Sequence, residues 1–138
     1  MRKIFILQLL LTGDFVQAQI KVPDIVSIAF TKQFADAKNV KWGKENAKEY
    51  EADFNLNGVK MSANYDLQGN WKETETEIAV KDLPQAILSA IKTKYPSATI
   101  SGADKVERAA HKIIYEADIK INGKKKEVEL FPNGKFVK

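Results

Sequence analysis

Tyr50-Glu51-Ala52-Asp53-Phe54-Asn55-Leu56-Asn57-Gly58-Val59-Lys60-Met61 is the stretch that decides the fold. Apolar and polar residues alternate up to Leu56, which is the pattern of a half-buried strand, and Asn57-Gly58 is a strong signal for a two-residue hairpin turn. Pairing Leu56 with Val59 across this turn places the apolar residues of both strands on one face, so the register is self-consistent. The further pairs are Phe54 with Met61, Ala52 with Ala63 and Tyr50 with Tyr65.

This hairpin belongs to a unit that occurs twice. Tyr50-Glu51-Ala52-Asp53 recurs 65 residues later as Tyr115-Glu116-Ala117-Asp118, and Asn57-Gly58 recurs as Asn122-Gly123. Upstream, an apolar stripe at helical spacing follows Pro23 and again Pro84, and proline suits the first turn of a helix. We therefore predict helices over about Asp24 to Ala35 and Pro84 to Lys94, each ahead of its own hairpin.

The predicted fold class is α+β, built from two tandem helix-plus-antiparallel-sheet units over residues 19–80 and 81–138. Each unit is expected to have about four strands, with the helix covering the apolar face of the sheet and both helices on one face. First strands are expected around residues 39–43 and 99–106, and fourth strands over about 71–78 and 135–137. The pattern leaves open whether the two sheets join.

Residues 1–18 have the pattern of an export signal. A basic start at Arg2 and Lys3 precedes an apolar run over residues 4–11, and small residues stand three and one positions before a cut after Ala18. The alternative is a buried N-terminal strand or helix. The run is much shorter than the roughly 20 residues that span a bilayer. We expect a periplasmic or secreted protein with no membrane span after signal cleavage.

The composition removes several classes of function. The net charge is +4 with acids and bases interleaved, which does not indicate a nucleic-acid partner. The chain contains no cysteine and a single histidine, His111, so disulfides, thiolate chemistry and histidine metal sites are excluded, and a serine triad would have to use His111. No glycine-rich phosphate loop is present. We therefore predict no cofactor, no metal ligands and no catalytic residues.

The sheet face turned away from the helices is the candidate functional surface. In the first unit it carries Glu51 and Asp53. The position of Trp71 depends on the turn before it: a two-residue loop places Trp71, Glu73 and Glu75 on this face, opposite Asn64, Ser62 and Lys60, whereas a glycine bulge sends Trp71 inward. We favour the two-residue loop, because it makes Trp71 an exposed aromatic on a charged sheet, and such aromatics commonly anchor protein interfaces.

In the second unit, the same register sets Asp118 opposite Glu127 and Glu116 opposite Glu129. Like charges directly across a sheet cost up to about 1 kcal/mol a pair. A bound cation such as calcium would explain them, and so would neutralisation by diagonal neighbours such as Lys120 and Lys125. We favour neutralisation, since no loop has the closely spaced acids of a calcium-binding loop.

An exported, cysteine-free tandem with Pro-x-x-Val-x-x-Ala-Phe, Val40-Lys41-Trp42, Tyr50-Glu51-Ala52-Asp53 and Asn57-Gly58 resembles a family of exported Bacteroides-type proteins. That family is described as PepSY-like and putative beta-lactamase-inhibitor-like, and the resemblance covers about Val22 to Val137. It implies the fold of the beta-lactamase inhibitory protein, in which two such units form a concave sheet that grips an enzyme. No inhibitor contact residue transfers, because no motif here matches one, and the disulfides of that inhibitor are missing.

We predict that the protein is a non-catalytic binding module that recognises a protein or peptide of the cell envelope. Trp71 and Trp42 are expected to be anchors, and Glu51, Asp53, Glu116 and Asp118 are expected to set the charge complementarity. The alternative is a carboxylate cation-binding or envelope stress protein. A hydrolase using His111 or paired carboxylates is the third possibility, and it would need a desolvated cleft that the alternation does not provide.

Overall fold

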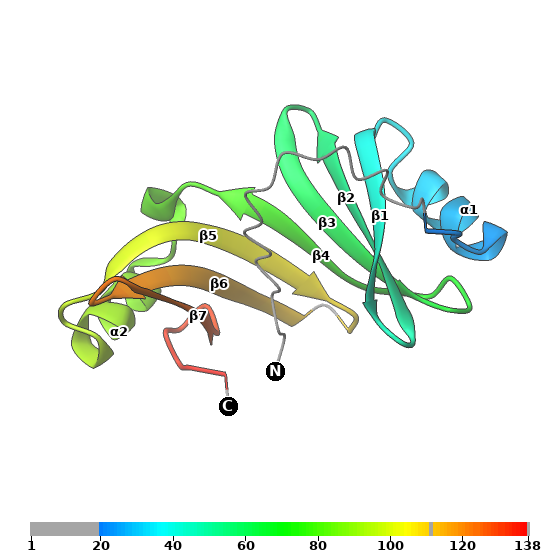
Figure 1. Ribbon diagram of the computed structural model, residues 1–138. Coiled ribbons are helices and arrows are strands. Elements are labelled where there is room, and N and C mark those ends of the chain that lie inside the picture. The colour runs from blue at the N-terminus through cyan, green and yellow to red at the C-terminus, as the bar shows by residue number, and fades with distance from the viewer. Residues whose placement is uncertain (1–19, 111, 138) are drawn as a thin grey trace.

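The computed structural model describes residues 20–110 and 112–137, which form one antiparallel sheet and two α-helices (Figure 1). The sheet has seven strands in the order in which they occur in the chain, β1 to β7. It is curved, with α1 beside β1 at one end and α2 near β6 and β7 at the other (Figure 1). The elements are α1 Asp24–Gln33, β1 Lys38–Asn46, β2 Glu49–Leu56, β3 Val59–Asp66, β4 Trp71–Ile78, η1 Val80–Asp82, α2 Gln85–Lys94, β5 Thr99–Arg108, β6 Lys112–Ile121 and β7 Lys124–Leu130.

The two expected sheets are joined into one through the pairing of β4 with β5. This pairing runs from Glu73 opposite Arg108 to Ile78 opposite Ala103 without a register shift. The described residues form one strand fewer than the total of about eight that the sequence predicts. The predicted strand over 135–137 is reduced to a single bridge between Leu130 and Phe136.

Both predicted hairpin registers are confirmed. Leu56 lies opposite Val59 and Tyr50 opposite Tyr65 in β2 and β3. In β6 and β7, Tyr115 lies opposite Leu130 and the pairing continues to the Asn122-Gly123 turn. Strict alternation and a two-residue turn with positive φ at both central residues are sufficient to fix this register.

The hydrophobic core consists of two clusters, one under each α-helix. Under α1, the Phe30 ring lies 5.1 Å from Phe54, 5.3 Å from Trp42 and 6.4 Å from Tyr65, all three edge to face. Aromatic pairs favour this arrangement. The buried residues of the first cluster are Val26, Phe30, Tyr50, Ala52, Phe54, Ala63 and Tyr65. Those of the second are Leu83, Ile87, Ile91, Ala103, Ala117, Ile119, Val128 and Leu130.

The prediction that Trp71 lies on the sheet face turned away from the helices is wrong. A bulge shifts the β3–β4 register, so that Trp71 lies opposite Tyr65 rather than Asn64, and its ring packs against the α1 cluster. Its Nε1 donates to Thr74 Oγ1 at 2.9 Å. The cause is the turn: Asp66 Oδ1 accepts hydrogen bonds from the backbone N–H groups of Gln68 and Asn70 at 3.0 and 2.9 Å.

Gly69 completes this turn and also permits close contact with α1. Its φ is +79°, and a Cβ added there would lie 2.8 Å from the carbonyl oxygen of Ile25. Gly58, in the β2–β3 turn, has a similar φ of +81°, but an added Cβ would meet nothing within 4 Å. The two glycines therefore share a backbone requirement and differ in the space around them.

We predict that Gly69→Ala is more destabilising than Gly58→Ala. The left-handed backbone alone costs a non-glycine residue about 1–2 kcal/mol, which both variants incur, and the clash with Ile25 adds at least about 1 kcal/mol in Gly69→Ala. Urea unfolding of the two variants measures this difference. Equal losses of free energy of unfolding would contradict the proposed role of Gly69 in seating α1.

Candidate functional site

The candidate site is the polar side of the sheet, which we call the polar face. Its residues alternate along each strand with those that pack under the helices, and the pairs Glu73–Arg108 and Glu75–Val106 make it continuous across the β4–β5 seam. Its acidic members are Glu49, Glu51, Asp53, Asp66, Glu73, Glu75, Glu77, Asp104, Glu116, Asp118, Glu127 and Glu129. Its basic members are Lys38, Lys41, Lys60, Arg108, Lys112, Lys120 and Lys125.

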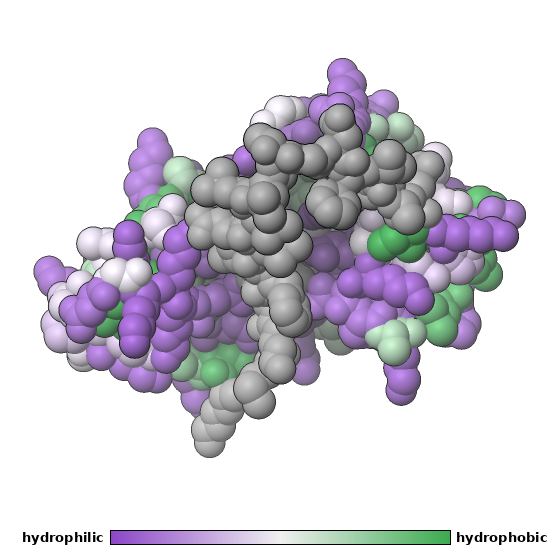
Figure 2. Space-filling view, viewed as in Figure 1, coloured by the Kyte–Doolittle hydropathy of each residue, from purple (hydrophilic) through white to green (hydrophobic). Residues whose placement is uncertain are grey.

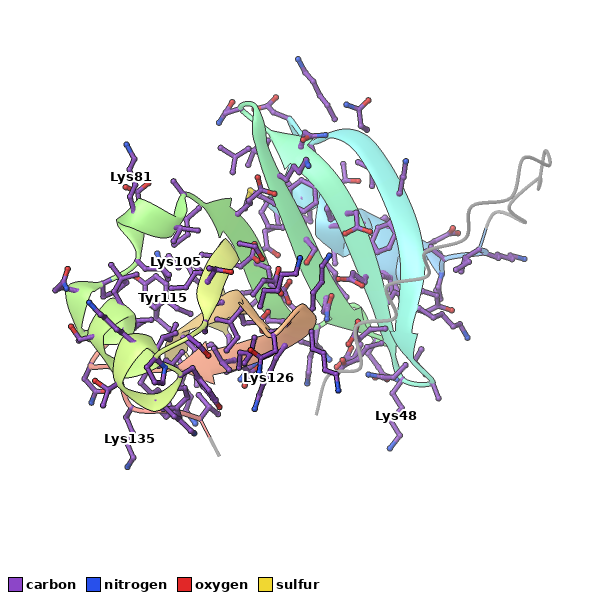
Figure 3. All side chains as sticks on the ribbon, turned by 60° about the vertical axis from the view of Figure 1, so that its left-hand side comes forward. Lys48, Lys81, Lys105, Tyr115, Lys126 and Lys135 are labelled. Carbon is purple, nitrogen blue, oxygen red and sulfur yellow. The ribbon has the colours of Figure 1, made fainter. Side chains whose placement is uncertain are left out.

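The polar face is acidic in a chain that is basic as a whole. It holds twelve acids and seven bases, as just named, whereas the whole chain has 18 acids and 22 bases. Most lysines lie elsewhere: Lys48, Lys81 and Lys135 point outward from the β1–β2 turn, η1 and the turn after β7 (Figure 3). Hydrophilic residues also cover most of the described surface in the view of Figure 2. The polar face therefore has an excess of acids, although the whole chain has an excess of bases.

Arg108 is the central ion-pairing residue of the polar face. Its Nε donates to Glu73 Oε2 on β4 and its Nη2 donates to Glu129 Oε1 on β7, both at 2.9 Å. Partial burial disfavours the charged guanidinium, but the hydrogen bonds to the two carboxylates outweigh it, and the pKa of Arg108 is raised. Because Arg108 stands on β5, its bond to Glu129 spans β6, and one side chain links strands of both halves.

A small apolar pair lies beside this ion-paired group. Val106 and Ile114 face each other across β5 and β6 and are 0% and 2% exposed, yet neither belongs to a helix-covered cluster. Burial of apolar surface on the polar face strengthens nearby ion pairs by lowering the local dielectric constant. The centre of the face is therefore ordered rather than a loose solvated lattice.

Asn64 is buried in the same row of residues. It is 2% exposed and lies opposite Glu51 on one side and Glu73 on the other. Its Nδ2 donates a long hydrogen bond to Glu73 Oε1 at 3.4 Å, but its Oδ1 accepts none within the described chain. An unsatisfied buried acceptor costs about 1–3 kcal/mol, so Asn64 is a candidate contact for an incoming donor.

An acidic hollow lies next to this row. It has a volume of about 170 Å³, with acidic residues from β2, β4 and β5 and one lysine from β3 around it. Burial raises the pKa of Asp53 in this hollow, and the charge of Lys41 opposes that rise. Within residues 20–110 and 112–137, no group of three or more acidic or histidine side chains is arranged to hold a metal ion. The lining is Glu51, Asp53, Lys60, Met61, Ser62, Glu75, Glu77 and Asp104.

The structure separates the predicted site residues into two groups. Glu51, Asp53, Glu116 and Asp118 lie on the polar face in the predicted registers. Trp42 and Trp71, the predicted anchors, both pack against the α1 cluster on the other side. Their predicted exposure on the polar face is therefore wrong, for Trp71 because of the bulge and for Trp42 because it pairs with Ala52, which points under α1.

Sequence reasoning did not predict the role of Arg108, and it placed Asn64 on the face without predicting that its side chain is a buried acceptor. The hairpin register already placed Asn64 opposite Glu51, and that was the available signal. No signal in the sequence pointed to Arg108, because its role depends on the pairing of β4 with β5 between the two halves of the sheet. Two sequence predictions concern residues outside the described ranges. They are the export signal over residues 1–18 and the considered catalytic role of His111.

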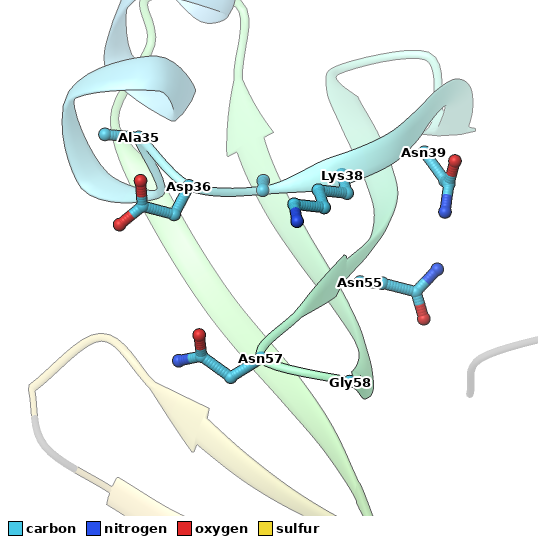
Figure 4. A pocket seen from close by; sticks show the side chains of 8 residues that line it. Ala35, Asp36, Lys38, Asn39, Asn55, Asn57 and Gly58 are labelled. Atoms are coloured by element: carbon cyan, nitrogen blue, oxygen red, sulfur yellow. The ribbon is translucent and has the colours of Figure 1, made fainter.

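A second hollow, of about 920 Å³, lies between the α1–β1 connection and the tip of the β2–β3 hairpin (Figure 4). It is lined by Asp36, Lys38, three asparagines and small residues, among them Asn57 and Gly58. No base stands beside a nucleophile in this set. We therefore place the candidate site on the polar face.

The fold is therefore α+β, with two α-helices and a seven-stranded antiparallel sheet that carries the charged polar face. The chain belongs to the family described as "Putative beta-lactamase-inhibitor-like, PepSY-like", which it matches over residues 16–62 and 48–138. None of the curated proteins is similar to it.

Solved structures of similar fold come from Bacteroides species. One, from Bacteroides eggerthii, is described as a putative periplasmic protein; it is 20% identical, with a TM-score of 0.77, over 86% of this chain and 88% of that one. A DUF2874 family protein from Bacteroides uniformis is 21% identical with a TM-score of 0.76, over 86% and 88%. A BLIP-like protein from Bacteroides fragilis is 21% identical with a TM-score of 0.67, over 88% and 86%.

Helices that could cross a membrane are not found in residues 20–110 and 112–137, because those present are too short and too polar. The longest have ten residues each.

The charged form of Asp53 on the polar face is expected to lower the stability of the protein, and the pH dependence of stability should show this. The raised pKa of Asp53 means that the folded protein binds this proton more tightly than the unfolded chain does. The stabilisation from this proton is therefore fully present below a pH of about 3.9, the pKa of Asp53 in the unfolded chain. It is lost as the pH rises through the pKa of Asp53 in the folded protein. Asp53→Asn should raise the melting temperature at pH 7, and the gain should vanish in acid.

Asp66→Asn provides a control of opposite sign. Hydrogen bonds from the Asn70 side chain and backbone lower the pKa of Asp66, so its stabilisation is present above the unfolded pKa and is lost as the pH falls through the folded value. This variant should melt at a lower temperature than the wild type at pH 7. Thermal melts of the two variants and the wild type, from acid to pH 7, test both predictions. A melting temperature of Asp53→Asn below that of the wild type at pH 7 would refute the prediction for Asp53.

Proposed function

We propose that this protein is an exported, non-catalytic binding module that recognises a protein or peptide of the cell envelope through its polar face. The observation that carries the proposal is the continuity of this face, which runs across all seven strands with ordered polar residues at its centre. A broad sheet surface suits a macromolecular partner better than it suits a small substrate, which needs a concave pocket.

The proposal treats the chain as two tandem units, over residues 19–80 and 81–138, with both helices on one side of the sheet. Glu51 and Asp53 of the first unit then correspond to Glu116 and Asp118 of the second. These four acids set the charge complementarity with the partner. Trp42 and Trp71 contribute by holding α1 against β1 to β4 rather than by touching the partner.

Export and the non-catalytic role have separate support. The family is described as beta-lactamase-inhibitor-like, which favours binding over catalysis, and a protein of the same fold is described as a putative periplasmic protein. The pattern of residues 1–18 favours export. Whether the partner is a beta-lactamase is not implied by any residue on the face.

The absence of cysteine from the sequence allows a steric test that does not depend on partner chemistry. Glu77 on β4 is exposed on the polar face, and Glu107 on β5 is exposed on the opposite side. Glu77→Cys and Glu107→Cys are therefore matched variants with one reactive thiol each. Each is used as bait in an envelope extract of the encoding bacterium, with and without a bulky maleimide polymer on the thiol.

We predict that the polymer on Cys at position 77 abolishes capture of the partner, whereas the polymer on Cys at position 107 leaves capture unchanged. Without the polymer, Glu107→Cys should capture the partner as the wild type does, and Glu77→Cys, which removes one acid of the polar face, should still capture it. If blocking position 77 leaves the same proteins bound, recognition does not use the polar face and the proposed function fails.

Carboxylate cation binding is the second candidate, and the pair Glu116–Glu129 favours it. The two acids lie directly opposite each other, and Glu116 is only 3% exposed. A cation that binds only the folded state raises its stability, so this candidate predicts a higher melting temperature in millimolar calcium. An unchanged melting temperature would exclude calcium binding at that concentration.

A further inference from the structure

The charge of the polar face carries information about the partner. The face has five more acids than bases, counted from the two sets that define it, although the chain carries a net charge of +4. Complementary potentials speed association and select partners. A surface of opposite sign to the rest of the molecule therefore favours a cationic partner and disfavours phosphate-bearing ones.

The second observation is independent of this charge. Asn64 Oδ1 is buried and accepts no hydrogen bond in the described chain, so it lacks a donor. Because Asn64 lies between Glu51 and Glu73 in the sheet register, a donor that approaches it passes two carboxylates. An ammonium or guanidinium group gains from both the acceptor and the carboxylates, whereas a neutral donor gains only from the acceptor.

The hydrogen bonds of Glu73 explain why this row is preorganised. Arg108 already holds Glu73 Oε2 at 2.9 Å, and the long Asn64 contact to Oε1 is 3.4 Å. The Glu73 carboxylate is thereby oriented before any partner arrives. Preorganised acceptors lose less side-chain entropy on binding, which raises affinity.

We propose that the segment recognised by the polar face is a cationic polypeptide whose Lys or Arg side chain donates to Asn64 between Glu51 and Glu73. This inference rests on the proposed function and specifies its partner. The seven strands are about 4.8 Å apart, so they extend over about 29 Å, and an extended segment of about ten residues crosses them.

The test uses the full chain and a defined probe, a fluorescent extended peptide of about ten residues in which Lys and Thr alternate. A peptide in which Glu and Thr alternate is the matched control probe. Fluorescence anisotropy should show saturable binding of the Lys–Thr peptide alone, and the affinity should fall with rising ionic strength, because exposed charges are screened by salt.

Charge reversal locates the binding surface. Asp53 and Asp118 occupy equivalent exposed positions of the two hairpins, so the double variant Asp53→Lys with Asp118→Lys leaves the buried row intact. Asp36→Lys with Asp82→Lys makes the same charge change off the face, at exposed sites before β1 and in η1. The first variant should bind the Lys–Thr peptide at least about tenfold more weakly, and the second within about twofold of wild type.

Asn64→Leu separates binding from folding. The substitution removes both the unsatisfied Oδ1 and the long Nδ2 contact to Glu73, and the two losses act on stability in opposite directions. The free energy of unfolding should therefore change little, while the dissociation constant of the peptide should rise several-fold. Equal affinity of the Lys–Thr and Glu–Thr peptides, or equal affinity of the two charge-reversal variants, would overturn the cationic partner.

Failure of this inference and failure of the proposed function give different results. If the polymer at position 77 blocks capture but the Lys–Thr peptide does not bind, the polar face is a binding surface for a partner that is not cationic. If the polymer has no effect, the face is not used at all. A melting temperature raised by calcium alone, without peptide binding, would assign the acids to a metal ion instead.

Discussion

The pairing of β4 with β5 is the constraint on which the rest of the structure depends. It joins the two hairpin systems in one register, so that Ala63 and Thr74 on one side of the seam face the same way as Ala103 beyond it. A shift of one residue at this seam would put Asp104 and Arg108 of β5 on the side of the sheet where Ala63 and Thr74 lie, since side chains alternate with period two. The Arg108–Glu73 ion pair lies across this seam and is satisfied only in the observed register.

The polar face is maintained at a cost in stability. Burying charged and polar groups requires desolvation that even good pairing only offsets, and this face holds Asn64 with an unsatisfied oxygen, Glu116 at 3% exposure and Asp53 with a raised pKa. A sheet selected for stability alone would carry apolar or well-solvated residues at these positions. Departures from full polar satisfaction are expected at functional sites, and this supports the proposal that recognition uses this face rather than the outer surfaces of the helices.

Much of the fold could be predicted from the sequence, because the decisive interactions are local. Asn57-Gly58 and Asn122-Gly123 fix two hairpins, and alternation assigns Glu51, Asp53, Glu116 and Asp118 to one face. The orientation of Trp71 could not be fixed in this way, since the turn before it closes in two ways and the hydrogen bonds that Asp66 accepts decide between them. The role of Arg108 was also beyond reach, because it depends on a contact 35 residues away in the chain.

The two halves of the sheet differ at one pair of corresponding positions, which lies in the proposed recognition surface. Asn64 and Glu129 correspond at the repeat offset of 65, and each lies opposite the equivalent glutamate, Glu51 or Glu116. In the second copy, Glu129 is engaged by Arg108. In the first, the carboxylate that Arg108 engages comes from Glu73 on the neighbouring strand, and Asn64 keeps an acceptor without a donor. Two equivalent halves would give two equivalent half-sites, whereas under the proposed function this asymmetry makes the first half the receptive one and directs the bound segment toward β2, β3 and β4.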